Sequence, residues 1–169
     1  MIKIDITDSM RNTAHTKSKE MGVLYKSITR GKGNVFGFLG EEIVRKVLGG
    51  EDHNTRDYDL LVNNKKIDVK TKKTSVTPKE NYECSVADVT RKQDCDYFAF
   101  VRVLNDQSVG WFLGLKERDE YYNEAVYLTK GEHDPSNNYF VKANCYNLPI
   151  SALDLNVNGI TDDGSKIKV

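Results

Sequence analysis

A chain of 169 residues, 38% apolar and 30% charged, has the composition of one globular domain with a single core. Lysines and arginines equal acidic residues at 25 each, so the net charge alone gives no reason to expect a nucleic-acid partner. Three widely spaced cysteines form no CxxC pair, which argues against a disulfide framework or a zinc cluster. No segment approaches the roughly 18 consecutive apolar residues of a membrane helix, and the start lacks a signal-peptide pattern. We therefore expect a soluble, cytoplasmic protein with no membrane partner.

The charge is divided unevenly along the chain. Residues 1–73 contain 15 basic and 10 acidic residues, whereas residues 74–169 contain 10 and 15, so their net charges are +5 and −5. Carboxylates that bind a metal ion would leave the first part more positive still. This distribution favours a protein that meets phosphate groups with one side only.

The first predicted element is a helix over residues 9–30. Its apolar positions, Met21, Leu24, Tyr25 and Ile28, recur at helical spacing, and the sequence RGKGN ends it. Basic residues occupy much of the remaining surface of this helix, so it adds to the positive first part of the chain.

A second helix is predicted over residues 34–50, with Asn34 as its cap and two glycines at its end. At about 100° per residue, Glu41 lies at the edge of the apolar face, whereas Glu42 points nearly opposite. Glu41 is therefore the acid expected to turn toward a site. The predicted apolar face contains Phe36, Leu39, Gly40, Ile43, Val44, Val47 and Leu48.

The rest of the chain is predicted to be mainly short strands rich in β-branched and aromatic residues. A tight turn, NNK, joins the first two strands into a hairpin. The predicted strands cover residues 57–62, 66–72, 82–87, 95–104, 109–115 and 139–150, and short helices are predicted over residues 88–94 and 116–128.

The most informative stretch is residues 57–73, where aspartates head one predicted strand and enter the next. Asp59 precedes Asp68 by nine residues, and Asp68 and Lys70 point to the same side of a strand because they are two apart. An aspartate followed at this spacing by Asp-x-Lys is typical of a metal-dependent phosphodiesterase. Asp57 would share the face of Asp59, so either aspartate fits the first position.

These elements together resemble the PD-(D/E)XK nuclease superfamily. The resemblance rests on GFLGEE at 37–42, YDLLV at 58–62 and IDVKTK at 67–72, and it extends over roughly residues 34–150. A finer likeness is to small nuclease-like proteins of bacteriophages, in which a GKGN and FLGE helix start precedes a DLLVN and IDVK hairpin. The superfamily's proline is absent, since a tyrosine precedes Asp59. That proline varies widely within the superfamily.

The resemblance implies a mixed α/β (α+β) fold with a restriction-endonuclease-like αβββαβ core. In such a core a central mixed sheet is flanked by helices, and here an extra N-terminal helix would precede it. We expect one nuclease-like domain over residues 1–156, divided into a helical extension, 1–33, and the core, 34–156. Residues 157–169 are expected to form a polar tail.

The resemblance also implies roles for particular residues. Asp59 and Asp68 would bind Mg²⁺ or Mn²⁺, with the backbone carbonyl of Val69 as a further oxygen ligand. Lys70 would orient or help to deprotonate the attacking water and stabilise charge on the phosphate. Glu41 would complete the site from its helix, directly or through water.

Further residues are candidates for the same surface. Asp57, Glu42 and Lys72 are alternatives for the site itself. The three histidines fit no zinc-binding spacing. Phosphate contacts are expected from Lys32, Lys65, Lys66, Lys72 and Lys73.

The sequence therefore predicts a metal-dependent endonuclease that hydrolyses phosphodiester bonds, in DNA rather than RNA. If phage-encoded, it would act in the host cytoplasm, and a homodimer would supply two sites for two cuts in a duplex. Two alternatives stay open: a nucleic-acid-binding or architectural protein of the same fold without catalysis, and a phage interaction subunit whose acidic residues 117–134 dock a basic partner.

Overall fold

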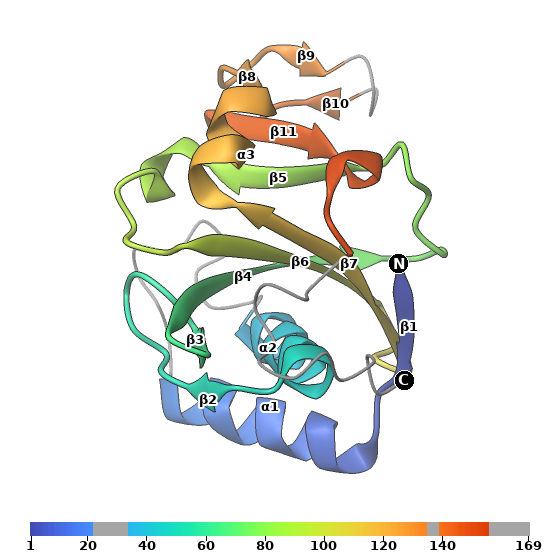
Figure 1. Cartoon of the computed structure of the whole chain (residues 1–169). Helices are drawn as coiled ribbons and strands as arrows, with labels where there is room; N and C mark the ends of the chain where they lie inside the picture. Colours follow the sequence, from blue (N-terminus) through green and yellow to red (C-terminus); the bar gives the residue numbers. More distant parts are fainter. Residues whose placement is uncertain (22–33, 135–138, 156–169) are drawn as a thin grey trace.

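A six-stranded mixed sheet divides the structure into two layers of packing (Figure 1). The computed structural model describes residues 1–21, 34–134 and 139–155. Strands β4 and β6 run parallel, and all other neighbours in this sheet are antiparallel. The predicted α+β class with a mixed sheet is therefore confirmed. The strand order is β1 (Ile2–Asp5), β7 (Val109–Glu117), β6 (Tyr97–Leu104), β4 (Lys65–Thr74), β3 (Leu60–Val62) and β2 (Glu51–Asp52).

Two helices lie on one face of this sheet. Helix α2 (Asn34–Leu48) packs directly on the sheet, and α1 (Asp8–Met21) packs on the far side of α2 (Figure 1). The predicted apolar face of α2 is buried except at Phe36, which is partly buried, and Leu39, Ile43 and Val44 have no exposed surface. Among the described residues, no helix has both the length and the apolar content to cross a membrane.

A smaller antiparallel sheet covers the opposite face of the large one (Figure 1). Tyr121 lies fully buried in this second core, and its hydroxyl oxygen lies 2.8 Å from the carbonyl oxygens of both Cys84 and Tyr146, which share its one proton as acceptors. The smaller sheet comprises β5 (Glu83–Ala87), β11 (Cys145–Pro149) and β8 (Val126–Leu128), and α3 (Arg118–Glu124) packs between it and β7. The remaining elements are β9 (His133–Asp134), β10 (Tyr139–Phe140) and the short 3-10 helices η1 (Asp88–Thr90) and η2 (Ile150–Ala152).

Ion pairs join the two helices to the edge of the sheet. Lys17 Nζ of α1 lies 2.7 Å from Asp52 Oδ2 and 3.4 Å from Glu42 Oε1. Arg45 also pairs with Glu42. Glu42 thus points away from the sheet, yet it is buried because α1 covers that side of α2.

Several predicted elements differ in extent from the observed ones. The strand predicted over 57–62 begins only at Leu60, because a turn occupies the residues before it. The helix predicted over 88–94 is the single 3-10 turn η1. The helix predicted over 116–128 ends at Glu124, since Ala125 is extended and the chain continues into β8.

The ends of the chain also differ from prediction. Strand β1 was not predicted, and it pairs with β7. The strand predicted over 139–150 is divided into β10 and β11. Met21, one of the four apolar positions predicted for the first helix, is 42% exposed and does not pack into the core. The other three apolar positions and the polar tail lie outside the described residues.

The observed order of elements departs from the expected αβββαβ order between β4 and β6. The predicted third strand, β5, pairs with β11 in the smaller sheet and not with the central strands. The connection from β4 to its parallel neighbour β6 passes through β5 and η1, so no long helix stands at this point of the described chain.

The contact between α2 and β4 is unusually close at Gly40. A Cβ at this position would lie 1.8 Å from Thr71 Oγ1 and 3.0 Å from Thr71 Cβ. The helix backbone therefore rests directly on the strand. Glu41, the next residue, is thereby held beside β4.

We expect Gly40→Ala to lower the free energy of unfolding by about 2 kcal/mol or more, because the methyl group overlaps Thr71 in a packed interface. Gly37→Ala is the matched control: it lies in the same helix, and a methyl group there would have no atom within 4 Å, so it should be neutral or stabilising by up to about 1 kcal/mol. Urea unfolding followed by circular dichroism measures both. Adding Thr71→Ala should recover part of the loss. Equal stability of the two alanine variants would contradict the close contact.

Candidate active site

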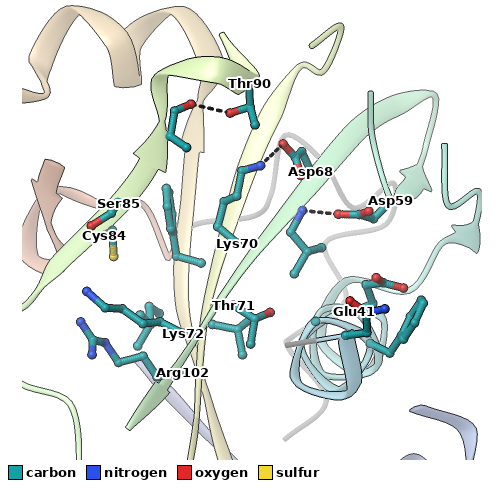
Figure 2. Close-up of a pocket in the computed structure, with 18 of the residues that line it drawn as sticks. Glu41, Asp59, Asp68, Lys70, Thr71, Lys72, Cys84, Ser85, Thr90 and Arg102 are labelled. Atoms are coloured by element: carbon teal, nitrogen blue, oxygen red, sulfur yellow. Dashed lines mark hydrogen bonds and ion pairs between the residues drawn. The ribbon is translucent and has the colours of Figure 1, made fainter. Parts of the chain in front are cut away.

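One cleft collects side chains from α2, from β4 and from the segment that leads into β3 (Figure 2). Its volume is about 520 Å³, and its lining includes Glu41, Asp59, Asp68 and Lys70. The four residues that carry the predicted chemistry thus line a single cavity.

Asp59 is aimed at β4 by a turn and by one hydrogen bond. Thr55 Oγ1 accepts hydrogen bonds from the backbone N–H groups of Asp57 at 3.2 Å and Tyr58 at 3.0 Å. The chain then enters β3, and Asp59 Oδ2 accepts a hydrogen bond from the Val69 N–H at 2.7 Å. This bond fixes the carboxylate against the edge of β4.

The edge of β4 is open where Asp59 meets it. Strand β3 pairs with β4 only as far as Ile67, opposite Leu60. Beyond Ile67, no strand among the described residues pairs with this edge. The N–H and C=O of one strand residue leave on the same edge, so the carbonyl of Val69 faces the side where its N–H meets Asp59. That carbonyl is therefore placed beside the carboxylates.

Asp68 and Lys70 lie on the face of β4 opposite α2, as strand alternation predicts. Lys70 Nζ is 2.6 Å from Asp68 Oδ2, and it lies 5.7 Å from the centre of the Phe98 ring. The ammonium group is thus held close to a carboxylate and against an aromatic surface.

Gln93 also contacts this site and was not predicted. Its Oε1 lies 3.4 Å from Lys70 Nζ, and its Nε2 donates a hydrogen bond to the Arg56 carbonyl at 2.6 Å. It connects the loop before β6 with the turn that aims Asp59. A single glutamine in a polar loop gives no sequence signal of such a role.

Glu41 carries an unusual charge environment. It is 6% exposed, and its Oε2 is buried with no hydrogen-bond partner among the described residues. Burial raises the pKa of Glu41 to about 8, and the nearby Asp59 carboxylate adds to the shift. Burial and the neighbouring Asp68 also raise the pKa of Asp59, while the Val69 N–H opposes that rise. The cluster is therefore acidic and short of positive charge.

The donor atoms of the cluster fit a hard divalent cation. Carboxylate and carbonyl oxygens are the ligands that Mg²⁺ and Mn²⁺ accept, and the unpartnered oxygen of Glu41 can still take a cation. In the described structure no three acidic, histidine or cysteine side chains already converge as a formed metal site. Asp68 Oδ2 instead contacts the ammonium of Lys70.

The two alternative acids lie elsewhere. Asp57 lines a separate hollow with Arg56 and Lys92. Glu42 faces Lys17 on the opposite side of its helix. Neither residue is among those that line the cleft.

The predicted phosphate-binding lysines are dispersed. Lys66 forms an ion pair with Asp94 at 2.5 Å, and Lys73 lies 4.2 Å above the ring of Phe36, on the α2 side of β4. Lys72 lines the cleft. The remaining two are Lys65, which is exposed, and Lys32, which lies outside the described residues.

Arg102 also lines the cleft, and sequence reasoning missed it. A signal was present, because it is the one charged residue in a strongly apolar predicted strand, 95–104, apart from Asp96 near its start. Alternation would have placed it on the same face as Phe98 and Phe100.

No protein-family model matches the chain, and no curated protein is similar to it at a significant level. The chemistry and geometry of the cleft are therefore the basis for inferring its function.

We expect the free energy of unfolding to fall, without divalent cations, as the pH rises from about 4.5 to about 8, and to fall less in Glu41→Gln. The folded protein binds the Glu41 proton more tightly than the unfolded chain does, so rising pH through this interval favours unfolding. Over this pH interval the difference in free energy of unfolding between the two proteins should change by a few kcal/mol, since a difference of one in pKa is worth about 1.4 kcal/mol. Urea unfolding in EDTA at several pH values measures it. Parallel curves for the two proteins would contradict the raised pKa.

Proposed function

We propose that this protein is a metal-dependent endonuclease that hydrolyses phosphodiester bonds in DNA in preference to RNA, in the cytoplasm. The observation that carries the proposal is the convergence of Glu41, Asp59, Asp68 and Lys70 on one cleft from three separate segments. An acidic cluster of this kind would repel a phosphate unless a cation reversed its sign, and Lys70 supplies a fixed positive charge beside it.

Some residues of the cleft would bind the cation, and another would bind the phosphate or the attacking water. Asp59, Asp68, the Val69 carbonyl and Glu41 would hold Mg²⁺ or Mn²⁺. When bound, such an ion neutralises charge on the phosphate and lowers the pKa of a coordinated water. Lys70 would donate hydrogen bonds to the phosphate or orient the water, since its ammonium group points into the cleft beside Asp68 (Figure 2).

We also propose that α2, the β3–β4 hairpin and β6 represent a restriction-endonuclease-like core. In support, a helix precedes an acid-bearing hairpin, and the next strand of the sheet runs parallel to the second strand of that hairpin. The arrangement departs from that core where β5 joins the smaller sheet and η1 replaces a longer helix.

The acidic segment 117–134 gives little support to the alternative that this protein is an interaction subunit which docks a basic partner. Lys116 Nζ lies 2.9 Å from Glu124 Oε1 and 3.6 Å from Glu120 Oε2, so part of the negative charge is matched within the chain. The Glu117 side chain accepts the Glu120 N–H at the start of α3. These acids therefore stabilise a short helix as well as carrying surface charge.

We expect purified protein to cut DNA in Mg²⁺ or Mn²⁺, and Asp59→Asn, Asp68→Asn and Lys70→Ala each to lose about 100-fold or more in rate. Asp57→Asn is the matched control, because it removes a neighbouring acid that lies outside the cleft, and it should retain activity within about twofold of wild type. Gel assays on linear, nicked, branched and single-stranded DNA and on RNA measure the rates.

Equal cutting by all of these proteins would show a contaminating activity and reject the site. Salt-dependent binding to DNA without cutting in either metal would favour the non-catalytic nucleic-acid-binding protein. Absence of both would favour the interaction subunit.

Metal binding can be tested without activity. We expect Mn²⁺ to raise the thermal unfolding midpoint of wild type and Asp57→Asn, because a ligand that binds only the folded state stabilises it. Asp59→Asn and Asp68→Asn should show little or none of that increase. An undiminished increase in both would place the ion elsewhere.

A further inference from the structure

Lys72 and Arg102 form a pair of cations in the cleft. They are register partners on the parallel strands β4 and β6, so their side chains rise from the same face of the sheet. Figure 2 shows them side by side, beyond Lys70 and on the far side of β4 from Glu41. Both residues line the cleft.

The orientation of Arg102 is fixed by its surroundings. It is 7% exposed, its Nη2 donates a hydrogen bond to the Glu83 carbonyl at 3.0 Å, and its guanidinium lies 5.1 Å from the Tyr82 ring centre. Within the described residues it forms no ion pair with a carboxylate. A buried guanidinium with neutral partners leaves its positive charge available to an anion.

Lys72 carries a second uncompensated charge. Lys72 is exposed to solvent and lines the cleft. Surrounding protein lowers the pKa of Lys72, and Arg102 lowers it further; the attraction from Asp134 is the smaller effect. Like charges on paired strands repel, so an anion bound between them would relieve the repulsion.

The neighbouring lysines of β4 make contacts that leave their charge less available to a phosphate than that of Lys72. Lys70 is in contact with Asp68, and Lys73 lies over Phe36 on the opposite face of the strand. Lys72 follows Lys70 by two residues on the same face, which is about 6.6 Å along a strand. Successive phosphates of a nucleic-acid backbone have a comparable spacing.

We infer that Lys72 and Arg102 bind the backbone phosphate next to the one that is cut. This inference rests on the proposed function, because Lys70 marks the position of the scissile phosphate. The nucleic-acid strand then follows β4 on the face away from α2, and its phosphates lie in turn beside Lys70 and beside the Lys72–Arg102 pair. The site would therefore require a substrate with at least two successive phosphates.

Equilibrium binding of a fluorescent DNA oligonucleotide over a range of salt concentrations, with Ca²⁺ in place of Mg²⁺, tests this subsite. Lys72→Met should weaken binding about tenfold and reduce the slope of log affinity against log salt by about 1, since one phosphate contact is lost. Lys72→Arg should retain the affinity. Lys73→Met is the matched control, because it removes an adjacent lysine of the same strand from the other face, and it should bind like wild type.

Thermal unfolding distinguishes a lost contact from a damaged fold, and all three variants should melt near the wild-type midpoint. Wild-type affinity and slope in Lys72→Met, or an equal loss in Lys73→Met, would overturn the subsite. So would a wild-type protein that does not bind DNA.

Failure of the subsite and failure of the nuclease remain distinguishable. If cutting depends on Asp68 and Lys70 but Lys72→Met binds and cuts normally, the subsite fails and the nuclease stands. If no variant or wild type cuts DNA while Lys72→Met alone loses binding, the nuclease fails and the phosphate site stands.

Discussion

Helix α2 can rest on strand β4 only because position 40 carries no side chain. A Cβ there would lie 1.8 Å from Thr71 Oγ1, so the helix backbone takes the space that another residue would fill. This contact sets the distance between the helix that carries Glu41 and the strand that carries Asp68 and Lys70. The rest of the cleft depends on it, and in the proposed nuclease the groups that act on one phosphate would have to be held within about 0.5 Å of their working positions.

The same cleft shows a conflict between burial and charge. The two carboxyls with raised pKa, Glu41 and Asp59, lie near each other, and Asp59 also lies near Asp68. Lys17 lowers the pKa of Glu41 and Lys70 lowers that of Asp59, but neither cation offsets the rise. Such a cluster opposes folding at neutral pH unless something positive enters it. A cluster of oxygen donors that is destabilising on its own agrees with the divalent cation proposed for this site.

Strand β4 carries an acidic group and cations of the cleft at different positions along its length. Its open edge carries Val69 and meets Asp59, and the face away from α2 carries the row of Asp68, Lys70 and Lys72. The acidic cluster thus lies where the strand edge is free of a neighbour, and the cations continue along the strand toward Arg102 (Figure 2). One strand therefore carries both an acidic centre and a row of cations, the arrangement on which the proposed binding of a nucleic-acid strand depends.

The local rules of helix periodicity and strand alternation were sufficient to predict several elements of this protein. Helical periodicity and a glycine ending placed α2 over nearly its observed length, and strand alternation placed Asp68 and Lys70 on one face, because both depend on backbone geometry alone. Only the tertiary structure separated Asp59 from Asp57, since the turn at Thr55 and the bond to Val69 join segments ten residues apart. It also placed β5 in the smaller sheet and brought Gln93 into contact with Lys70. Those placements arise from packing between distant segments, which no local pattern in the sequence encodes. Arg102 stood out in the sequence as a charged residue in an apolar strand, but only packing placed it in the cleft.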